Sequence, residues 1–157
     1  MSSQVLSPQV TERLQPWIRF LRAHAAVTRQ LSTRLETQHG ITLSDFDVLA
    51  QLYVAPEHAL RRVDLARQVL LTASGITRLL ERLERAGWVA KQRCATDARV
   101  TYAVLTDEGV RKFESVRGSH IADIEELFGS RFTDEEHDRL GELLGKLPLS
   151  ETACADD

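Results

Sequence analysis

The stretch that decides the fold reads TASGITRLLERLERAGWVAKQRCATDARVTYAVL and covers residues 72–105. In its first half, apolar residues recur at the i, i+3, i+4 and i+7 positions of a helix that packs on a core along one side. These residues are Ile76, Leu79, Leu80 and Leu83. Gly87 is expected to end the helix, because glycine adopts a left-handed conformation at the least cost. Two strand-like runs follow, at 88–93 and 99–105, and the polar segment 94–98 joins them into a predicted hairpin.

The outward face of the predicted helix is small and basic. Hydroxyl and guanidinium side chains lie opposite the apolar stripe, and the hairpin that follows is also basic. Thr72 is a suitable N-cap, because its hydroxyl accepts a hydrogen bond from a free amide. A helix with such a face, followed by a basic hairpin, is typical of proteins that read a DNA groove. The outward residues of the helix are Ser74, Thr77, Arg78 and Arg82.

Four short motifs follow one another around this region. They are Leu65-Ala66, the run Thr-Arg-Leu-Leu-x-Arg-Leu-Glu-x-x-Gly over 77–87, Asp97-x-Arg99, and Leu105-Thr106-x-x-Gly109. Their order and spacing resemble the winged helix-turn-helix of the MarR family of bacterial transcription regulators, and the resemblance extends from about residue 10 to residue 147. It implies a mainly α fold with a small β-wing. N- and C-terminal dimerisation helices would flank a winged helix-turn-helix core.

This resemblance implies a single MarR-type domain over residues 1–148. Its DNA-binding lobe should cover about 42–105, and the dimerisation helices about 8–39 and 106–147. The small, acidic tail at 149–157 is expected to be disordered. A second copy is expected to cover the terminal helices, because they are long, amphipathic and remote in sequence from the core. The alternative is that they pack on their own domain.

Length and composition indicate one globular domain. The chain has 157 residues, of which 43% are hydrophobic and 27% charged, and these values are ordinary for such a domain. No apolar run approaches the roughly 20 residues that span a bilayer, and the first ten residues lack the blocks of a signal peptide. We therefore expect a cytoplasmic protein without a membrane partner. Cys94 and Cys154 are too few and too far apart for a disulfide framework.

The net charge of −3 is unevenly distributed along the chain. Residues 61–105 hold nine basic residues and four acidic ones, whereas residues 106–157 hold six basic and fourteen acidic ones. Positive charge is thus concentrated in the predicted helix and hairpin, where neutralising phosphates would supply salt-dependent affinity for DNA. The alternative is a solvated arginine-rich face with no ligand.

The N-terminal part of the chain predicts two helices. Ser7-Pro8 is a helix start, Pro16 suggests a break or restart, and the helical pattern stops near Gly40. Ser44 is the predicted N-cap of a second helix, with Asp47 approximating a capping box. Pro56 would end this second helix.

The flanks of the predicted helix and hairpin complete the expected elements. A short third strand is predicted at 59–61 and a short helix at about 62–70. After the hairpin, Thr106 should begin a long helix that ends at Gly129. Thr133 should then cap a last helix, with Glu136 completing a capping box.

Each residue of the expected DNA interface has a role that its chemistry suits. Arg78 is the expected guanine contact, because two N–H groups of an arginine match the O6 and N7 of guanine. Arg82 would touch a phosphate or pair with Glu81 or Glu84. The full set is Thr72, Ser74, Thr77, Arg78, Arg82, Lys91, Arg93, Asp97, Arg99, Arg61 and Arg62.

The resemblance implies further roles in the hairpin. Arg99 would enter the flanking minor groove and Asp97 would shape the tip, while Lys91 and Arg93 would contact the DNA backbone. Alternatively, Asp97 and Arg99 form only a cross-strand pair. The implied partner is double-stranded DNA with an inverted repeat, whose half-sites lie about 34 Å apart to match a two-fold dimer.

Family members usually repress, and small aromatic acids, phenols or oxidants release them. Three residues near one face of the first helix could line an effector pocket, and two residues of the second helix could close it. They are Trp17, Phe20 and His24, and Phe46 and Tyr53. The alternative is that these are core aromatics. Cys94 offers a redox-responsive alternative at the hairpin tip.

No catalytic motif points to an enzyme. We found no glycine-rich phosphate loop, nucleophile elbow or paired histidine motif, and the five histidines have no metal-ligand spacing. No cofactor is therefore expected. A winged helix that binds only other proteins is a further alternative.

Overall fold

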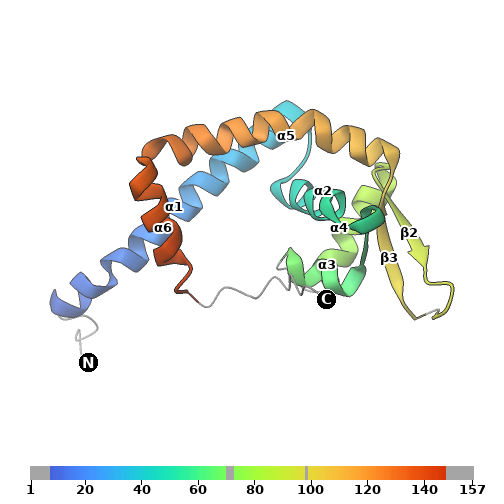
Figure 1. Cartoon of the computed structure of the whole chain (residues 1–157), viewed down its shortest axis with the longest axis horizontal. Helices are drawn as coiled ribbons and strands as arrows, with labels where there is room; N and C mark the ends of the chain where they lie inside the picture. Colours follow the sequence, from blue (N-terminus) through green and yellow to red (C-terminus); the bar gives the residue numbers. More distant parts are fainter. Residues whose placement is uncertain (1–7, 70–72, 98, 148–157) are drawn as a thin grey trace, which may run out of the picture.

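The computed structural model describes residues 8–69, 73–97 and 99–147. Two long helices, α1 (Pro8–His39) and α5 (Asp107–Leu127), lie side by side and form an arch over the molecule (Figure 1). Below one end of the arch is the lobe, residues 42–105. At the other end, α6 (Asp134–Leu144) lies next to the first half of α1, and the short 3-10 helix η2 (Gly129–Arg131) connects it to α5.

In its described residues, the lobe consists of three α-helices, one short 3-10 helix and a three-stranded sheet. The strands are antiparallel in the order β1-β3-β2, with β3 pairing across its length with β2, from Val89↔Leu105 to Arg93↔Thr101. This confirms the predicted hairpin and third strand. The elements are α2 (Leu43–Val54), η1 (Pro56–His58), β1 (Ala59–Arg61), α3 (Arg62–Gln68), α4 (Ala73–Arg85), β2 (Val89–Arg93) and β3 (Thr101–Leu105).

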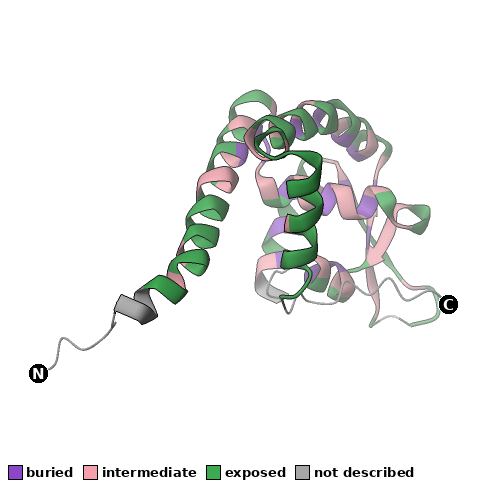
Figure 2. Ribbon diagram, turned by 60° about the vertical axis from the view of Figure 1, so that its left-hand side comes forward, coloured by how far each residue is buried: buried purple, intermediate pink, exposed green. Residues whose placement is uncertain are grey.

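The apolar stripe predicted for α4 is the centre of the lobe's core. Leu80 and Leu83 are fully buried, and Ile76 and Leu79 are 4% exposed. They pack against Val48, Leu49 and Leu52 of α2 and against residues of α3, β2, β3 and α5. Buried positions gather in this lobe in Figure 2. Burial of each of these leucines contributes about 1.5–3 kcal/mol. The lobe is therefore stabilised by contacts within its own chain.

A compact turn joins the wing, formed by β2 and β3, to the lobe and to α5. Gly87 ends α4 with φ 78°, as predicted. The Thr106 hydroxyl caps α5 by accepting the Gly109 amide at 3.0 Å, and it donates to the Gly87 carbonyl at 2.7 Å. A Cβ on Gly109 would lie 2.1 Å from the Trp88 carbonyl oxygen. Only glycine therefore allows α5 to begin so close to β2.

Two predictions about helix ends were wrong. The N-cap of α2 is Thr42 with Asp45, not Ser44 with Asp47, because Thr42 has the extended backbone that exposes its hydroxyl to the Asp45 amide. The first helix also continues through Pro16 to His39. A proline costs one internal hydrogen bond, and a helix of 32 residues retains the others.

The remaining helix predictions were confirmed where they can be assessed. Gly40 follows α1 with φ 65°, and Thr133 and Glu136 form the expected capping box of α6. The predicted Thr72 cap and the tail at 149–157 lie outside the described residues.

One part of the molecule lacks a core of its own. We call it the arm and define it as residues 8–30 of α1 together with α6. Trp17, Phe20 and Leu143 are 55%, 41% and 45% exposed, and no residue of α6 is buried. The N-terminal part of α1 is mostly exposed in Figure 2. Among the α1 residues whose burial is described, 12–39, the first buried one is Leu31, close to where α1 meets α5 and the lobe.

Candidate nucleic-acid interface

The outer face of α4 presents polar side chains to solvent. Thr77 and Arg78 are exposed, one turn into the helix, while the buried stripe of α4 holds the helix against the lobe. Thr72 and the side chain of Ser74 lie outside the described part of the chain. The geometry thus leaves Arg78 accessible to a groove, as the predicted guanine contact requires.

Arg82 faces a different partner from those expected. Its Nε and Nη2 donate to one carboxylate oxygen of Asp45 in α2, at 3.1 and 2.5 Å. Asp45 is buried, with 4% of its surface exposed. Within the described residues, the ion pair of Arg82 is therefore with Asp45 rather than with Glu81 or Glu84.

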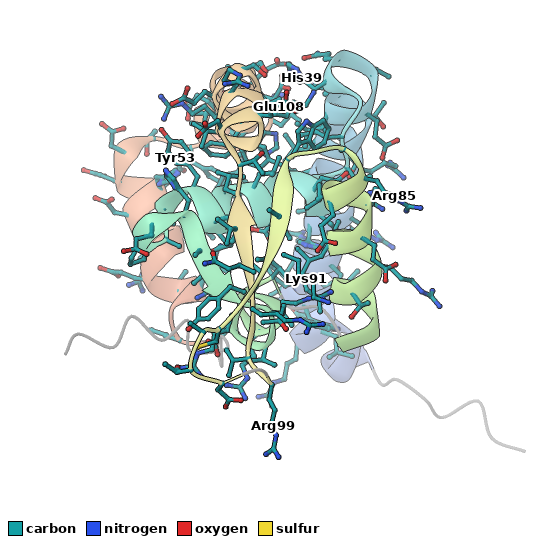
Figure 3. The ribbon with its side chains drawn as sticks, turned by 90° about the vertical axis from the view of Figure 1, so that its right-hand side faces the viewer. His39, Tyr53, Arg85, Lys91, Arg99 and Glu108 are labelled. Atoms are coloured by element: carbon teal, nitrogen blue, oxygen red, sulfur yellow. The ribbon has the colours of Figure 1, made fainter. Side chains whose placement is uncertain are left out.

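The wing extends away from the lobe and ends in a cation. Figure 3 shows Arg99 at the far end of the hairpin, directed away from the protein, with Lys91 further back along β2. Lys91, Arg93 and Arg99 are all exposed. Asp97 accepts the Arg99 amide at 2.9 Å, and this bond fixes the backbone of the tip while the guanidinium of Arg99 remains available.

The wing tip also contains Cys94. Its sulfur lies 3.2 Å from the Thr96 hydroxyl, and the hydrogen bonds from Thr96 lower the pKa of the Cys94 thiol. The thiolate is thus favoured mainly by Thr96.

A hollow of about 390 Å³ lies between α3, α4 and the wing. Arg61, Arg62, Thr77 and Arg99 are among its lining residues, so the structure brings these four predicted contacts together. The Nε of Arg61 lies 3.6 Å from the Oδ2 of Asp64. The Nη2 of Arg62 is buried and has no hydrogen-bond partner among the described residues. A concavity lined by three arginines suits the oxygen atoms of a DNA backbone.

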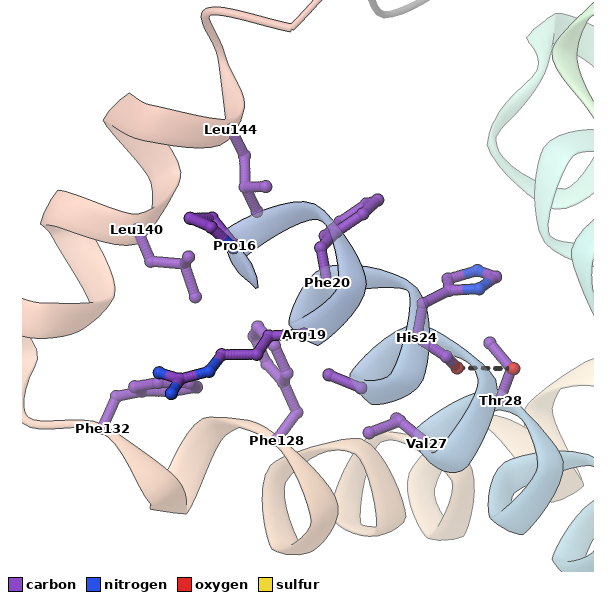
Figure 4. A pocket seen from close by; sticks show the side chains of 11 residues that line it. Pro16, Arg19, Phe20, His24, Val27, Thr28, Phe128, Phe132, Leu140 and Leu144 are labelled. Atoms are coloured by element: carbon purple, nitrogen blue, oxygen red, sulfur yellow. Dashed lines mark hydrogen bonds between the residues drawn. The ribbon is translucent and has the colours of Figure 1, made fainter. Parts of the chain in front are cut away.

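An apolar hollow of about 480 Å³ separates α1 from α6 (Figure 4). Of the three α1 residues expected near an effector pocket, Phe20 and His24 line this hollow and Trp17 does not; Trp17 stacks on Phe20 with ring centroids 6.1 Å apart. The other lining residues are Pro16, Arg19, Ala23, Val27, Thr28, Phe128, Phe132, Leu140 and Leu144.

The structure does not bring Phe46 and Tyr53 to this hollow. Their rings pack on Phe113 of α5, at 5.3 and 4.6 Å between centroids, and the Tyr53 hydroxyl donates to Glu114. Phe46 and Tyr53 therefore lie at the junction between the lobe and the arch. They are far from Phe20 and His24 because α1 runs away from the lobe toward its N-terminus.

Sequence reasoning missed two residues of that junction. His120 is 3% exposed, its Nδ1 finds no hydrogen-bond partner in the described part of the chain, and its ring centroid lies 4.3 Å from that of Phe46. Burial lowers the pKa of His120, with Asp123 opposing the shift. Asp45 was missed because its partner, Arg82, is 37 residues away. Its position three residues after Thr42 was an available signal of a capping box.

The described ranges contain no cluster of residues suited to a metal ion. Among the helices of these ranges, none has the length and apolar character needed to cross a membrane.

Comparisons with known proteins agree with this geometry. A model of the MarR family matches residues 39–100. The regulator YkoM of Bacillus subtilis is 31% identical over 127 residues, which are 81% of this chain and 80% of that protein. MhqR, an HTH-type transcriptional regulator of the same organism, is 27% identical over 142 residues, covering 90% and 95%. The crystal structure of Sco3205, a MarR family regulator from Streptomyces coelicolor in complex with DNA, superposes with a TM-score of 0.82 at 26% identity, covering 92% and 88%.

Proposed function

Because this chain belongs to the MarR family of DNA-binding transcription regulators, we propose that it acts as a homodimeric repressor on an inverted-repeat operator. The observation that carries the proposal is the placement of α4 and the wing. Arg78 of α4 and Arg99 of the wing are both exposed, and the basic hollow lies between the two elements. A solved relative, Sco3205, is bound to DNA.

A dimer explains the exposed apolar face of the arm. Trp17, Phe20 and Leu21 are 41–55% exposed on α1, and the neighbouring hollow is lined almost entirely by carbon. Contiguous exposed apolar surface of this kind marks an interaction site. A second copy, related by a two-fold axis, would bury both arms at once and hold the two lobes at a fixed spacing.

Each lobe of the dimer would read one half-site. The α4 helices would enter successive major grooves about 34 Å apart, with Arg78 on a guanine. Arg99 would reach the flanking minor groove, where an arginine senses groove width as well as charge. Arg61, Arg62, Lys91 and Arg93 would lie against the DNA backbone and supply the salt-dependent part of the affinity.

We further propose that a small aromatic, phenolic or carboxylate compound releases the repressor. Its site would be the hollow beside Phe20 and His24, which a second copy would close. Such a compound acts only if it binds better to a lobe spacing that does not fit DNA. Isothermal titration of phenols and benzoates, with and without DNA, tests this step.

The decisive experiment for DNA binding is an Arg99→Ala variant. It should weaken binding to an operator duplex by about tenfold or more while the dimer stays folded, because a charge-assisted contact is lost. Arg111→Ala, the same truncation at an exposed position of α5, is the matched control and should bind as the parent does. Equal affinities of the parent and Arg99→Ala in a mobility-shift titration would refute the role of Arg99. A parent that binds no duplex at low salt would support the protein-interaction alternative.

The lowered pKa of Cys94 favours a second candidate function, redox control. Oxidation of a thiolate beside Thr96 would alter the wing tip that presents Arg99. Peroxide should then abolish operator binding by the parent and leave the Cys94→Ser variant unaffected. Equal sensitivity of the two proteins would remove this candidate.

A further inference from the structure

Arg82 differs from the other cations of the interface in having a buried partner. Two of its N–H groups meet one oxygen of Asp45, and Nη2 also donates to the Thr42 hydroxyl at 3.3 Å. The Arg82 side chain is 49% exposed and that of Asp45 only 5%. A planar guanidinium fork that satisfies a buried carboxylate is held in one orientation.

Asp45 has no spare capacity for another partner. Its second oxygen accepts the Thr42 amide and the Thr42 hydroxyl, both at 2.8 Å. The carboxylate therefore caps α2 and binds α4 at the same time. Without Arg82, a buried negative charge would keep only its local hydrogen bonds, which is a costly arrangement.

The same turn of α2 also contacts the arch. Phe46, the residue after Asp45, packs its ring on His120 and Phe113 of α5. Ile41, just before the cap, is 1% exposed and clusters with Leu35 of α1 and Val116 of α5. The start of α2 is thus where α1, α5 and α4 meet.

We infer that Arg82 is a positioning residue for DNA recognition, which orients α4 relative to the arch through Asp45 and does not itself bind DNA. The inference rests on the proposed DNA-binding function. Arg78 lies one turn earlier on the same helix, so a rotation of α4 would displace it from its base. A loss of Arg82 should consequently lower binding to the correct sequence and leave the general attraction to DNA unchanged.

The test compares two duplexes. One is selected by the parental protein from a random-sequence library, and the other is a scrambled duplex of the same length and composition. Arg82→Gln should bind the selected duplex about tenfold more weakly and the scrambled duplex as well as the parent does. The slope of log affinity against log salt should not change, because no phosphate contact is lost. Arg82→Lys should resemble Arg82→Gln, because lysine keeps the charge but lacks the fork.

Asp45→Asn provides a test with the opposite electrostatic sign. Removing a negative charge beside a DNA-binding surface should strengthen binding if only charge matters. We expect it to weaken binding to the selected duplex as Arg82→Gln does, with no further loss in the double variant, because both changes break one pair. Asparagine retains an oxygen for the cap of α2. Thermal melts establish that each variant is folded at the assay temperature.

Other results would overturn the inference. A phosphate contact would make Arg82→Lys bind like the parent, while Arg82→Gln would lose affinity for both duplexes and lower the salt slope by about 0.9. A purely structural role would lower the melting temperature without changing the ratio of selected to scrambled affinity. If Arg82→Gln is unfolded, the ratio of selected to scrambled affinity measured with Arg82→Lys tests the inference instead. A parental protein that selects no sequence would instead refute the DNA-binding function itself, which is a separate failure.

Discussion

The lobe and the arm both contain helices with apolar leucine faces, but they differ in how far these leucines are buried. In the lobe, Leu80 and Leu83 are fully buried against neighbours from their own chain. In the arm, Leu21 and Leu143 remain 44% and 45% exposed. An amphipathic helix stabilises a fold only when its apolar face is covered. The lobe therefore meets this condition within one chain, whereas we propose that the arm meets it only with a second copy.

The two regions also differ in charge. Residues 61–105 carry nine basic and four acidic residues, and residues 106–157 carry six and fourteen. An acidic surface is repelled by DNA. The difference therefore favours one orientation of the molecule, with the wing and α4 toward the duplex and α6 away from it.

The contrast in burial predicts its largest effect for a leucine pair. Leu80→Ala should lower the free energy of unfolding by about 3–5 kcal/mol, because it leaves a cavity in the core of the lobe. Leu143→Ala, the same truncation in the arm, should change it by less than about 0.5 kcal/mol for the dissociated chain. Urea unfolding at low protein concentration measures both. Similar losses in the two variants would contradict the contrast.

A charge in the arm should affect assembly instead. Phe20→Asp is expected to raise the dimer dissociation constant about a hundredfold or more, because it places a carboxylate in the proposed apolar interface. The control is Gln38→Asp, at an exposed position of the same helix outside the arm. Sedimentation equilibrium measures both constants. Should Phe20→Asp assemble like the parent, the arm would not be the dimer interface.

Two glycines of α5 show where this helix is in tight contact with the lobe and where it is open. Gly109→Ala should destabilise the protein by about 2 kcal/mol, because its Cβ would collide with the Trp88 carbonyl. Gly118→Ala meets nothing within 4 Å and should stabilise α5 by up to about 1 kcal/mol. Thermal unfolding of both variants measures the difference. An unchanged melting temperature of Gly109→Ala would show that the turn at Trp88 shifts at little energetic cost.

The smallest expected effect concerns His120, between the lobe and the arch. Burial lowers its pKa, so the unfolded chain binds more protons than the folded one as the pH falls below about 6.5. His120 should therefore reduce stability in acid, by at most about 1.4 kcal/mol per pH unit. Unfolding of the parent and of His120→Leu between pH 7.5 and 5.5 isolates this contribution. Parallel pH profiles would contradict it.

Local patterns predicted the elements of the lobe and the starts of α5 and α6 well. The stripe of α4, the hairpin, the left-handed Gly87 and the Thr106 and Thr133 caps each depend on residues within a few positions of one another. The exposed placement of Arg78 and Arg99 follows from the same periodicity. Such features are predictable because short-range geometry determines them.

Long-range pairing was not predictable in this way. The Arg82–Asp45 pair joins residues in different helices, and the separation of Phe46 and Tyr53 from Phe20 and His24 depends on the course of α1. Pro16 suggested a break or restart in the first helix. The helix instead continues through it, because one missing hydrogen bond is a small fraction of those in α1.

Because α1 is a single unbroken helix, a small tilt of its axis produces a large displacement at its ends. A helix of 32 residues is about 48 Å long at 1.5 Å per residue. A tilt of only about 5° between its ends then displaces one end by about 4 Å, which exceeds the rise of a single DNA base pair, about 3.4 Å. From Phe20 to His39 the helix measures about 28 Å, so the same tilt beside Phe20 would displace the His39 end, next to the lobe, by about 2.5 Å, which is a large part of that rise.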